Sequence, residues 1–361
     1  MAENTTAAAP PRHDPKVITA LKRFAMSMTI FNILGYTVFG FEQPWTWPFI
    51  ALAVGYSFEL ILERFGARSE NRAPRYRGGG AKGLMEFLLP AHITSLAVQM
   101  LTYVNDQLLV MIFGVLVAIG AKWILRAPVK GRMRHYMNPS NFGIAVILVL
   151  FPWASIAPPY HFSENVSGPV DWIIPAVILT AGTMLNAKLT NRMWLIGAWL
   201  ITFALQAVVR GVILDVSILG GLIMMTGIAF VLFTNYMITD PGTSPSRPAA
   251  QVAFGAGVAV VYGFLTGFGI AYGIFFATAI VCGIRGGFHW TLHFIEKARV
   301  LRAAQERAAA SAATVGKGPQ ATVPADGSAD RTADAEATGT TVPTTDDARP
   351  DKGPGKEVVP A

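Results

Sequence analysis

Long apolar runs alternate with short polar segments from residue 22 to residue 287. A helix that crosses the hydrocarbon core of a bilayer needs about 20 mostly apolar residues. Ten windows meet that requirement, with a range of nine to eleven because some are short or interrupted by glycine: 22–41, 46–63, 84–103, 107–125, 140–157, 171–188, 193–213, 217–238, 250–267 and 269–287. The pattern predicts an all-α integral membrane protein with about ten transmembrane helices.

Lysine and arginine residues test this count because they accumulate in the cytoplasmic loops of membrane proteins. If both chain ends lie in the cytoplasm, every lysine and arginine up to Arg307 falls on the cytoplasmic side, with the exception of Arg210. We therefore predict a multi-pass protein of the inner, cytoplasmic membrane with both termini in the cytoplasm. The net charge of +7 then reflects orientation in the lipid bilayer, and no nucleic-acid partner is expected.

Composition agrees with a membrane protein and excludes several kinds of site. Hydrophobic residues make up 52% of the chain and charged residues only 14%, whereas charged residues are about a quarter of a soluble domain. Cys282 is the single cysteine, which excludes a disulfide framework. His289 and His293 have the i, i+4 spacing of metal ligands but no acidic neighbour in that turn, so we expect no metal. No motif of hydrolytic enzymes or phosphate loops is present.

The ends of the chain differ from its middle. Residues 1–20 are polar and proline-rich, without a cleavable signal peptide, and are predicted to be a disordered cytoplasmic segment. The membrane domain is predicted over residues 21–287. Residues 288–310 have an aromatic first half and a basic second half, which favours an amphipathic helix at the cytoplasmic interface. Residues 311–361 have no apolar period and predict a disordered cytoplasmic tail.

Two windows carry polar residues that a simple membrane span would avoid. The third contains Pro90, where the helix is expected to kink or break, followed by Thr94 and Ser95. The eighth ends in Thr239 and Asp240. Unpaired backbone at membrane depth is tolerated only against protein or a water-filled cavity, and interrupted helices line the binding sites of transporters built from inverted repeats. Ten spans divided five and five predict two inverted five-helix repeats with these two windows as counterparts.

Asn138 precedes the fifth window in a similar way, within the segment MNPSNFGIAV. Two interpretations stay open for these positions. Asn138-Pro139 and Asp240-Pro241-Gly242 are compatible with ordinary helix starts and turns. Alternatively, the chain bends there around a bound molecule. Under the second interpretation a central cavity is lined by polar groups, which are Thr94, Ser95, Asn138, Thr239 and Asp240.

The order of several short motifs over residues 84–287 resembles one family. The family comprises the RnfD membrane protein of the Rnf ferredoxin-linked electron-transport complex and its relative NqrB of the sodium-pumping NADH:quinone oxidoreductase. The resemblance rests on a serine- and threonine-rich third span, on the GAK segment at Gly120 to Lys122, and on three further segments: Asn138-Pro139, Phe151-Pro152 and Thr239-Asp240-Pro241. It implies ten helices in two inverted repeats, a role in electron transport and a bound flavin.

The chain departs from the family where flavin is attached. Members carry FMN on a threonine in a Ser/Thr-Gly-Ala-Thr motif after the fifth span, but here Ser167-Gly168 is followed by Pro169-Val170. Val170 has no hydroxyl, so a covalent phosphoester is not expected, and the remaining cofactor expectation is a noncovalent flavin, FMN or riboflavin. This departure is similar to a branch encoded in enediyne-antibiotic gene clusters.

Three functions therefore stay open from the sequence. The first is a redox subunit or accessory protein in a natural-product pathway, working with other membrane or soluble redox or biosynthetic subunits. The second is a transporter of a small solute or natural product. The third is a membrane scaffold for a soluble biosynthetic enzyme. Whether the protein is itself an enzyme is left open.

The basic loops predict the location of the chain ends in a way that fusion reporters can test. A reporter that works only in the cytoplasm should be active when fused to either terminus. It should be inactive when inserted in the loop that follows Arg210, between the seventh and eighth windows, which the charge pattern places outside. Activity of an exterior-only reporter at either terminus would contradict the ten-helix arrangement.

Overall fold

The structure is a computed structural model that describes residues 15–129, 131–158 and 165–315. The chain divides into two compact units, Met1–Arg302 and Ala303–Ala361. The described part of the second unit is the end of one long helix, and all further description concerns the first unit.

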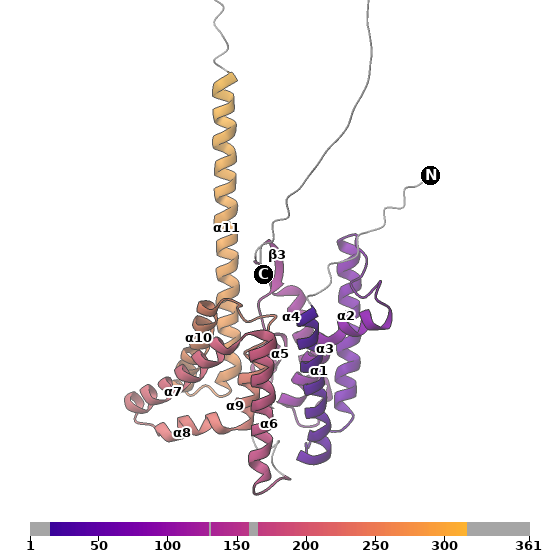
Figure 1. Ribbon diagram of the computed structural model, residues 1–361, viewed down its shortest axis with the longest axis vertical. Helices are drawn as coiled ribbons and strands as arrows, with labels where there is room; N and C mark the ends of the chain where they lie inside the picture. The colour runs from indigo at the N-terminus through magenta and orange to yellow at the C-terminus, as the bar shows by residue number, and fades with distance from the viewer. Residues whose placement is uncertain (1–14, 130, 159–164, 316–361) are drawn as a thin grey trace, which may run out of the picture. The chain divides into compact units, whose positions relative to one another are not determined.

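The first half of this unit is a helical bundle with two small strand pairs (Figure 1). Its elements are α1 (Pro15–Leu34), the π-helical turn η1 (Gly35–Phe39), α2 (Trp47–Ser69), α3 (Gly80–Leu101), β1 (Thr102–Tyr103), α4 (Leu108–Ile124), β2 (Arg126–Val129), β3 (Arg132–His135), α5 (Pro139–Leu150) and β4 (Ser155–Ile156). Strand β1 pairs antiparallel with β4, and β2 pairs antiparallel with β3 as a hairpin between α4 and α5.

The second half is also helical. Its elements are α6 (Val170–Leu185), the π-helical turn η3 (Asn186–Thr190), α7 (Met193–Leu214), α8 (Ile218–Ile223), the 3-10 turn η4 (Met224–Thr226), α9 (Ile228–Leu232), the π-helical turn η5 (Phe233–Met237), α10 (Pro248–Gly267) and α11 (Gly273–Val315). The prediction of a mainly helical chain is confirmed.

Helices occur at all ten predicted windows, but fewer of them meet the length and composition of a membrane span. In the described part of the chain five helices do so: Pro15–Phe39, Gly80–Leu101, Val170–Thr190, Met193–Leu214 and Pro248–Gly267. A sixth is added if the bent pair Ile218–Thr226 and Ile228–Met237 counts as one span. Helix α4 has 17 residues and α5 only 12. At 1.5 Å per residue α5 is about 18 Å long, less than the hydrocarbon core of about 30 Å.

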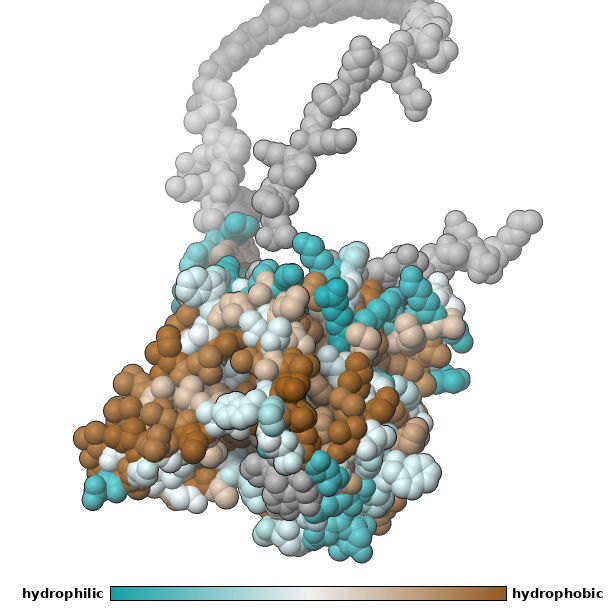
Figure 2. All heavy atoms as spheres, turned by 60° about the horizontal axis from the view of Figure 1, so that its bottom comes forward, coloured by the Kyte–Doolittle hydropathy of each residue, from teal (hydrophilic) through white to brown (hydrophobic). Residues whose placement is uncertain are grey.

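Apolar side chains on the outside of the bundle agree with a membrane-embedded protein. Large hydrophobic residues with more than half of their surface exposed lie along α6, α7 and α8, for example Trp172, Ile201 and Leu219. Figure 2 shows hydrophobic residues covering much of one face. Soluble monomers rarely expose continuous apolar surface on this scale. These helices therefore indicate a protein embedded in lipid.

Three boundaries differ from the sequence prediction. Helix α1 begins at Pro15, so residues 15–20 of the predicted disordered segment are helical. Helix α11 runs unbroken from Gly273 to Val315, so residues 288–310 are not a separate interfacial helix, and residues 311–315 continue it. Alanine, arginine and glutamate dominate the end of this helix and favour its continuation. The remaining residues of both predicted disordered ends, 1–14 and 316–361, lie outside the described residues.

The third window lacks the predicted break, whereas the eighth window is interrupted as predicted. Helix α3 passes through Pro90 without interruption. The eighth window does break, with a bend of 63° between Ile218–Thr226 and Ile228–Met237. Gly227 lies at the bend and has extended backbone angles, φ −71° and ψ 143°. These angles are open to any residue, and a Cβ atom on Gly227 would lie 3.5 Å from the carbonyl oxygen of Met224, an ordinary contact, so the bend does not depend on glycine.

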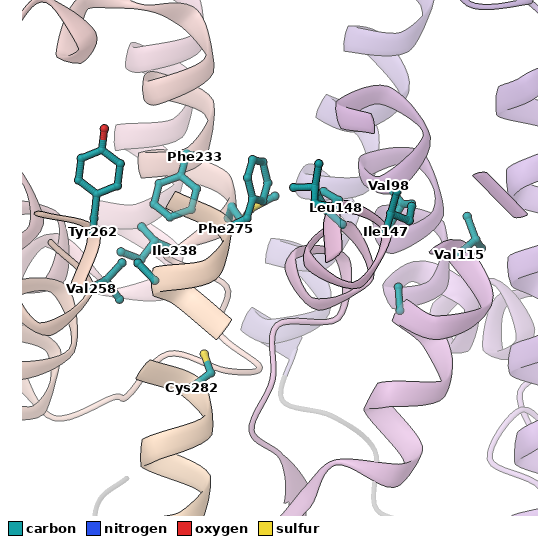
Figure 3. Close-up of a cluster of buried hydrophobic side chains, with 14 of the residues drawn as sticks. Val98, Val115, Ile147, Leu148, Phe233, Ile238, Val258, Tyr262, Phe275 and Cys282 are labelled. Atoms are coloured by element: carbon teal, nitrogen blue, oxygen red, sulfur yellow. The ribbon is translucent and has the colours of Figure 1, made fainter. Parts of the chain in front are cut away.

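Close helix packing within each half depends on glycine. Helix α4 packs against α5, and α7 packs against α10. A Cβ atom on Gly143 of α5 would lie 2.6 Å from the carbonyl oxygen of Gly114, and one on Gly255 of α10 would lie 2.6 Å from the carbonyl oxygen of Leu195. The apolar core, part of which is shown in Figure 3, includes Val115 and Ile147 from the first half and Val258 from the second.

These contacts predict opposite effects for two glycine substitutions. Gly255→Ala should lower the free energy of unfolding by about 1–3 kcal/mol, because the added methyl group meets backbone that side-chain rotation cannot move. Gly197→Ala in α7 is the matched control, since a Cβ atom there meets nothing within 4 Å. It should leave stability unchanged or raise it slightly. Thermal denaturation in detergent measures both, and equal melting temperatures would contradict the packing.

Candidate functional site

A large cavity lies between segments from both halves. Its volume is about 1080 Å³, the upper end of the range for small-molecule sites. Apolar residues make up most of its wall, among them Phe24 of α1, Ile93 of α3, Phe230 of α9 and Tyr262 of α10. Gly227, where the eighth window bends, also faces it. The bend therefore contributes to the cavity wall.

Aromatic rings form one section of this wall. Phe203 of α7 packs edge-on against Phe230, with ring centroids 4.7 Å apart, and stacks on Tyr262 at 5.0 Å with 25° between the ring planes. Trp199 lies behind them, stacked on Phe230 and donating a hydrogen bond to Thr234 Oγ1 at 2.9 Å. Such a wall suits a flat, apolar or aromatic group.

Basic residues form a second section of the wall, which we call the basic cluster: Lys122, Arg126, Arg134 and His135. The β2–β3 hairpin supplies three of them, since Arg126 pairs with His135 across its register. Burial lowers the pKa of His135, while the nearby carboxylate of Asp240 acts to raise it. Burial also lowers the pKa of Arg126, but an arginine remains protonated at neutral pH.

Asn138 connects the start of α5 to the end of η5. Its side-chain oxygen accepts hydrogen bonds from Asn141 N and Ser140 Oγ, both at 3.0 Å, and so caps α5. Its side-chain nitrogen donates to the carbonyl oxygen of Met237 at 2.9 Å. Asn138 is buried and lines the cavity. The helix-start interpretation and the cavity interpretation therefore both apply to this residue.

The turn that follows η5 is held from several directions. The Asp240 carboxylate accepts bonds from Gly242 N at 3.1 Å and Thr243 Oγ1 at 2.8 Å, which closes the turn. Arg192 donates to Ser244 Oγ at 2.7 Å, and Arg285 of α11 donates to the carbonyl oxygen of Thr243. Asp240 faces the cavity.

Thr239 has a structural role instead. Its hydroxyl donates to the carbonyl oxygen of Asn235 at 2.6 Å, and the same oxygen accepts from Asn186 Nδ2 at 2.8 Å. Thr239 is not among the residues that line the cavity. Its hydroxyl and the Asn186 amide instead share this backbone carbonyl of the π-helical turn η5.

Of the adjacent residues Thr94 and Ser95, only Thr94 lines the cavity. Thr94 of α3 is buried and lines the cavity. Ser95 is fully buried and points toward Gly55 of α2, whose missing side chain makes room for it. Neighbouring residues on a helix point about 100° apart, so the two cannot share one surface. The cavity thus brings together Thr94, Asn138 and Asp240, without Ser95 and Thr239.

The sequence analysis did not select the basic cluster or the aromatic wall as site residues. The lysine and arginine residues were used only to orient the chain, and the aromatic residues looked like ordinary membrane-span residues. A signal was present in the spacing of Lys122, Arg126 and Arg134, which surround a short hairpin beside Asn138.

The carboxylates of α2 and α3 within the predicted spans each have a basic partner. Glu86 pairs with Lys22 and Glu59 with Lys122, at 2.8 and 2.5 Å. Glu63 pairs with Arg72 and Arg75. It does not pair with Arg64, its neighbour in sequence, because side chains one position apart on a helix do not face each other.

Two further predicted features can be located. Within the described ranges no group of three His, Cys, Asp or Glu side chains could hold a metal ion. His289 and His293 lie on α11 beside Phe288, Trp290 and Phe294. Val170, at the position where flavin is attached in the resembling family, is the first residue of α6 and is 44% exposed.

No protein-family model matches this chain, and no curated protein is significantly similar to it in sequence. The family resemblance therefore stays a prediction.

The contacts of Asn138 predict a graded loss of stability. Asn138→Ala removes the cap of α5 and the bond to Met237, and should lower the free energy of unfolding by about 2 kcal/mol or more. Asn138→Asp keeps the capping oxygen but loses the donor, so its melting temperature should fall between those of the alanine variant and the wild type. Thermal denaturation in detergent measures this order, and a wild-type melting temperature for Asn138→Ala would contradict it.

Proposed function

We propose that this protein is a redox or accessory subunit of the cytoplasmic membrane that binds a noncovalent flavin, FMN, in the cavity. The observation that carries the proposal is the combination of an aromatic wall and a basic cluster in one cavity of about 1080 Å³. The resemblance to the RnfD protein of the Rnf complex supports the same ligand. A partner protein of the membrane or a natural-product enzyme would then exchange electrons with the bound flavin.

The charges of the cavity fit a phosphate. In the described part of the chain Arg126 and Arg134 form no ion pair with a carboxylate, while Lys122 is balanced by Glu59. Asp240 is the acidic residue of the wall, and its carboxylate already accepts two hydrogen bonds. A surplus of positive charge next to an apolar wall favours a ligand with an anionic and an apolar end. The residues that would hold the phosphate are Arg126, Arg134 and Lys122.

The aromatic wall fits the other end of such a ligand. A flat ring system can stack against Phe230 and Tyr262, whose positions are set by Phe203. When bound, a flavin supplies electron transfer, and the protein residues orient the flavin and keep water from it. A phosphoester at Val170 is excluded by its chemistry, so binding has to be noncovalent.

We also propose that the two halves are inverted repeats, which would give ten helices with both termini in the cytoplasm. Helices α1 and α6 each end in a π-helical turn, and each turn is followed by a left-handed residue, Gly40 with φ 78° and Asn191 with φ 52°. A polar side chain that follows each π-helical turn then bonds a group just beyond the end of a later helix. Gln43 donates to the Thr102 carbonyl oxygen, and Arg192 donates to Ser244. The matching turns and the bonds that follow them support a repeat.

Transport of a small solute or natural product is the second candidate. The position of the cavity between the two halves supports it, because transporters built from repeats bind substrate at the repeat interface. The lining also includes Ile223, Met224 and Tyr272, far in sequence from the basic cluster. Export of a product that is still synthesised would stop in a deletion strain if this candidate holds.

A membrane scaffold for a soluble enzyme is the third candidate. Arg299 and Arg302 are exposed on α11 and could meet an acidic partner. Co-purification of a soluble enzyme, lost when these arginines are replaced, would favour this candidate.

Flavin binding provides the direct test of the first proposal. Protein purified from the membrane should show flavin absorbance that acid or heat releases completely. Arg134→Ala should weaken FMN binding roughly fivefold to tenfold, because this exposed arginine lines the cavity and its charge is partly screened.

Arg132→Ala is the matched control, since Arg132 lies on the same strand and is not part of the lining. It should bind FMN as the wild type does, and neither change should affect riboflavin, which has no phosphate. Absence of flavin after purification, together with failure to bind added FMN, would contradict the proposal.

A further inference from the structure

Lys122 takes part both in the cavity wall and in a buried ion pair. Its side chain lines the cavity within the basic cluster, and its ammonium nitrogen also lies 2.5 Å from Glu59 Oε1. Glu59 is in α2, Lys122 is near the end of α4, and the two helices pack together. Glu59 is 2% exposed, whereas the Lys122 side chain is 18% exposed. A ligand in the cavity can therefore reach Lys122 but not Glu59.

Glu59 has few other partners. Its second oxygen, Oε2, is buried and has no hydrogen-bond partner among the described residues. Glu63, one turn further along α2, is different: Arg72 and the backbone nitrogen of Arg75 both donate to it, at 2.5 and 2.7 Å. A buried carboxylate normally keeps partners on both oxygens. Glu59 thus depends on Lys122 for its negative charge. Glu63 also pairs with the side chain of Arg75, a residue of the cavity wall, but Arg72 and the Arg75 backbone nitrogen remain its partners if that side chain turns to a ligand.

Removing one member of a buried ion pair strands the other as an uncompensated charge, which costs several kcal/mol. If an anion in the cavity draws the Lys122 ammonium group away, no other cation among the described residues pairs with Glu59 to replace it. The cheapest response is to take up a proton and become neutral. Anion entry and protonation of Glu59 are then one coupled event.

We propose that binding of an anionic ligand in the cavity is coupled to the uptake of one proton by Glu59, through the shared partner Lys122. The proposal rests on the proposed function only in requiring that the cavity takes an anion. In this step the Lys122 ammonium exchanges its bond to the Glu59 carboxylate for one to the ligand. Glu59 takes one proton from water, so each anion enters together with one proton.

The other acidic and histidine side chains of α2 and α3, two helices that pack against α4, already have partners. On α2, Glu63 is bound by Arg72 and Arg75. On α3, the two ring nitrogens of His92 bond Tyr56 of α2 and Thr29 of α1, at 2.6 and 2.8 Å. On the α3 side Glu86 pairs with Lys22.

Across the cavity, His135 faces Asp240, Lys122, Arg126 and Arg134. Since burial lowers its pKa, His135 stays neutral above pH 7. Above that pH it should not contribute to the proton uptake.

The dependence of FMN affinity on pH tests the coupling. Between about pH 7.5 and 8.5 the phosphate of FMN stays doubly ionised. Uptake of one proton with each ligand should then weaken wild-type binding about tenfold for each pH unit gained. Glu59→Gln cannot take up a proton and frees Lys122, so its affinity should change less than about twofold over the range and exceed that of the wild type at the upper end.

Two variants separate this effect from general disturbance. Glu70→Gln is the matched control, because Glu70 pairs with Arg72 and is not part of the cavity, and it should keep the wild-type slope. Arg134→Ala should weaken binding but also keep the slope, since Arg134 has no bond to Glu59. A Glu59→Gln variant that keeps the tenfold slope would overturn the inference while leaving flavin binding intact.

A second probe distinguishes failure of the inference from failure of the proposed function. Sulfate is fully ionised over the same range, and its binding can be followed by the proton uptake of the protein in weakly buffered detergent solution. The wild type should take up about one proton for each sulfate bound, and Glu59→Gln should take up none. If FMN does not bind but sulfate gives this result, the flavin proposal is wrong and the coupling stands. Sulfate binding without proton uptake, or no sulfate binding, would overturn the coupling.

Discussion

A helix that stops inside a hydrocarbon layer leaves backbone groups that water cannot reach, and the fold of this protein depends on how those groups are satisfied. Side-chain amides do this at three points. Asn138 bonds the carbonyl oxygen of Met237, Asn141 that of Phe275, and Asn186 that of Asn235. Asn138 and Asn141 lie at the start of α5 and Asn186 at the start of η3, and each amide reaches backbone of another helix or turn far away in the sequence. The interrupted helices are therefore stable only as a set.

This constraint explains which features the sequence could predict. Apolar length located the helices, because burying a span in lipid requires about 20 apolar residues whatever the helix packs against. The same constraint pointed to Asn138 and Asp240, because a polar residue beside proline at the edge of an apolar run needs a hydrogen-bond partner. Both residues have those partners, and both line the cavity.

Features that depend on which way a side chain points could not be predicted. Ser95 and Thr239 are as polar as Thr94, yet one fills the space above Gly55 and the other bonds backbone. The break at Gly227 and the continuity at Pro90 show a similar limit. Proline weakens a helix locally, but the neighbouring helices decide whether it breaks. The role of Lys122 was equally hidden, because its partner Glu59 is 63 residues away.

The cavity itself follows from unequal packing. Within each half, glycines such as Gly143 and Gly255 let helices approach until backbone meets backbone, which leaves no room for a ligand. Between the halves, Asn138 and Asn141 span the distance with single hydrogen bonds to backbone. Links of this kind hold two bundles at a set separation without filling the space between them. A ligand can then occupy that space without disturbing the core of either half, which is the arrangement a resident cofactor or a passing substrate requires.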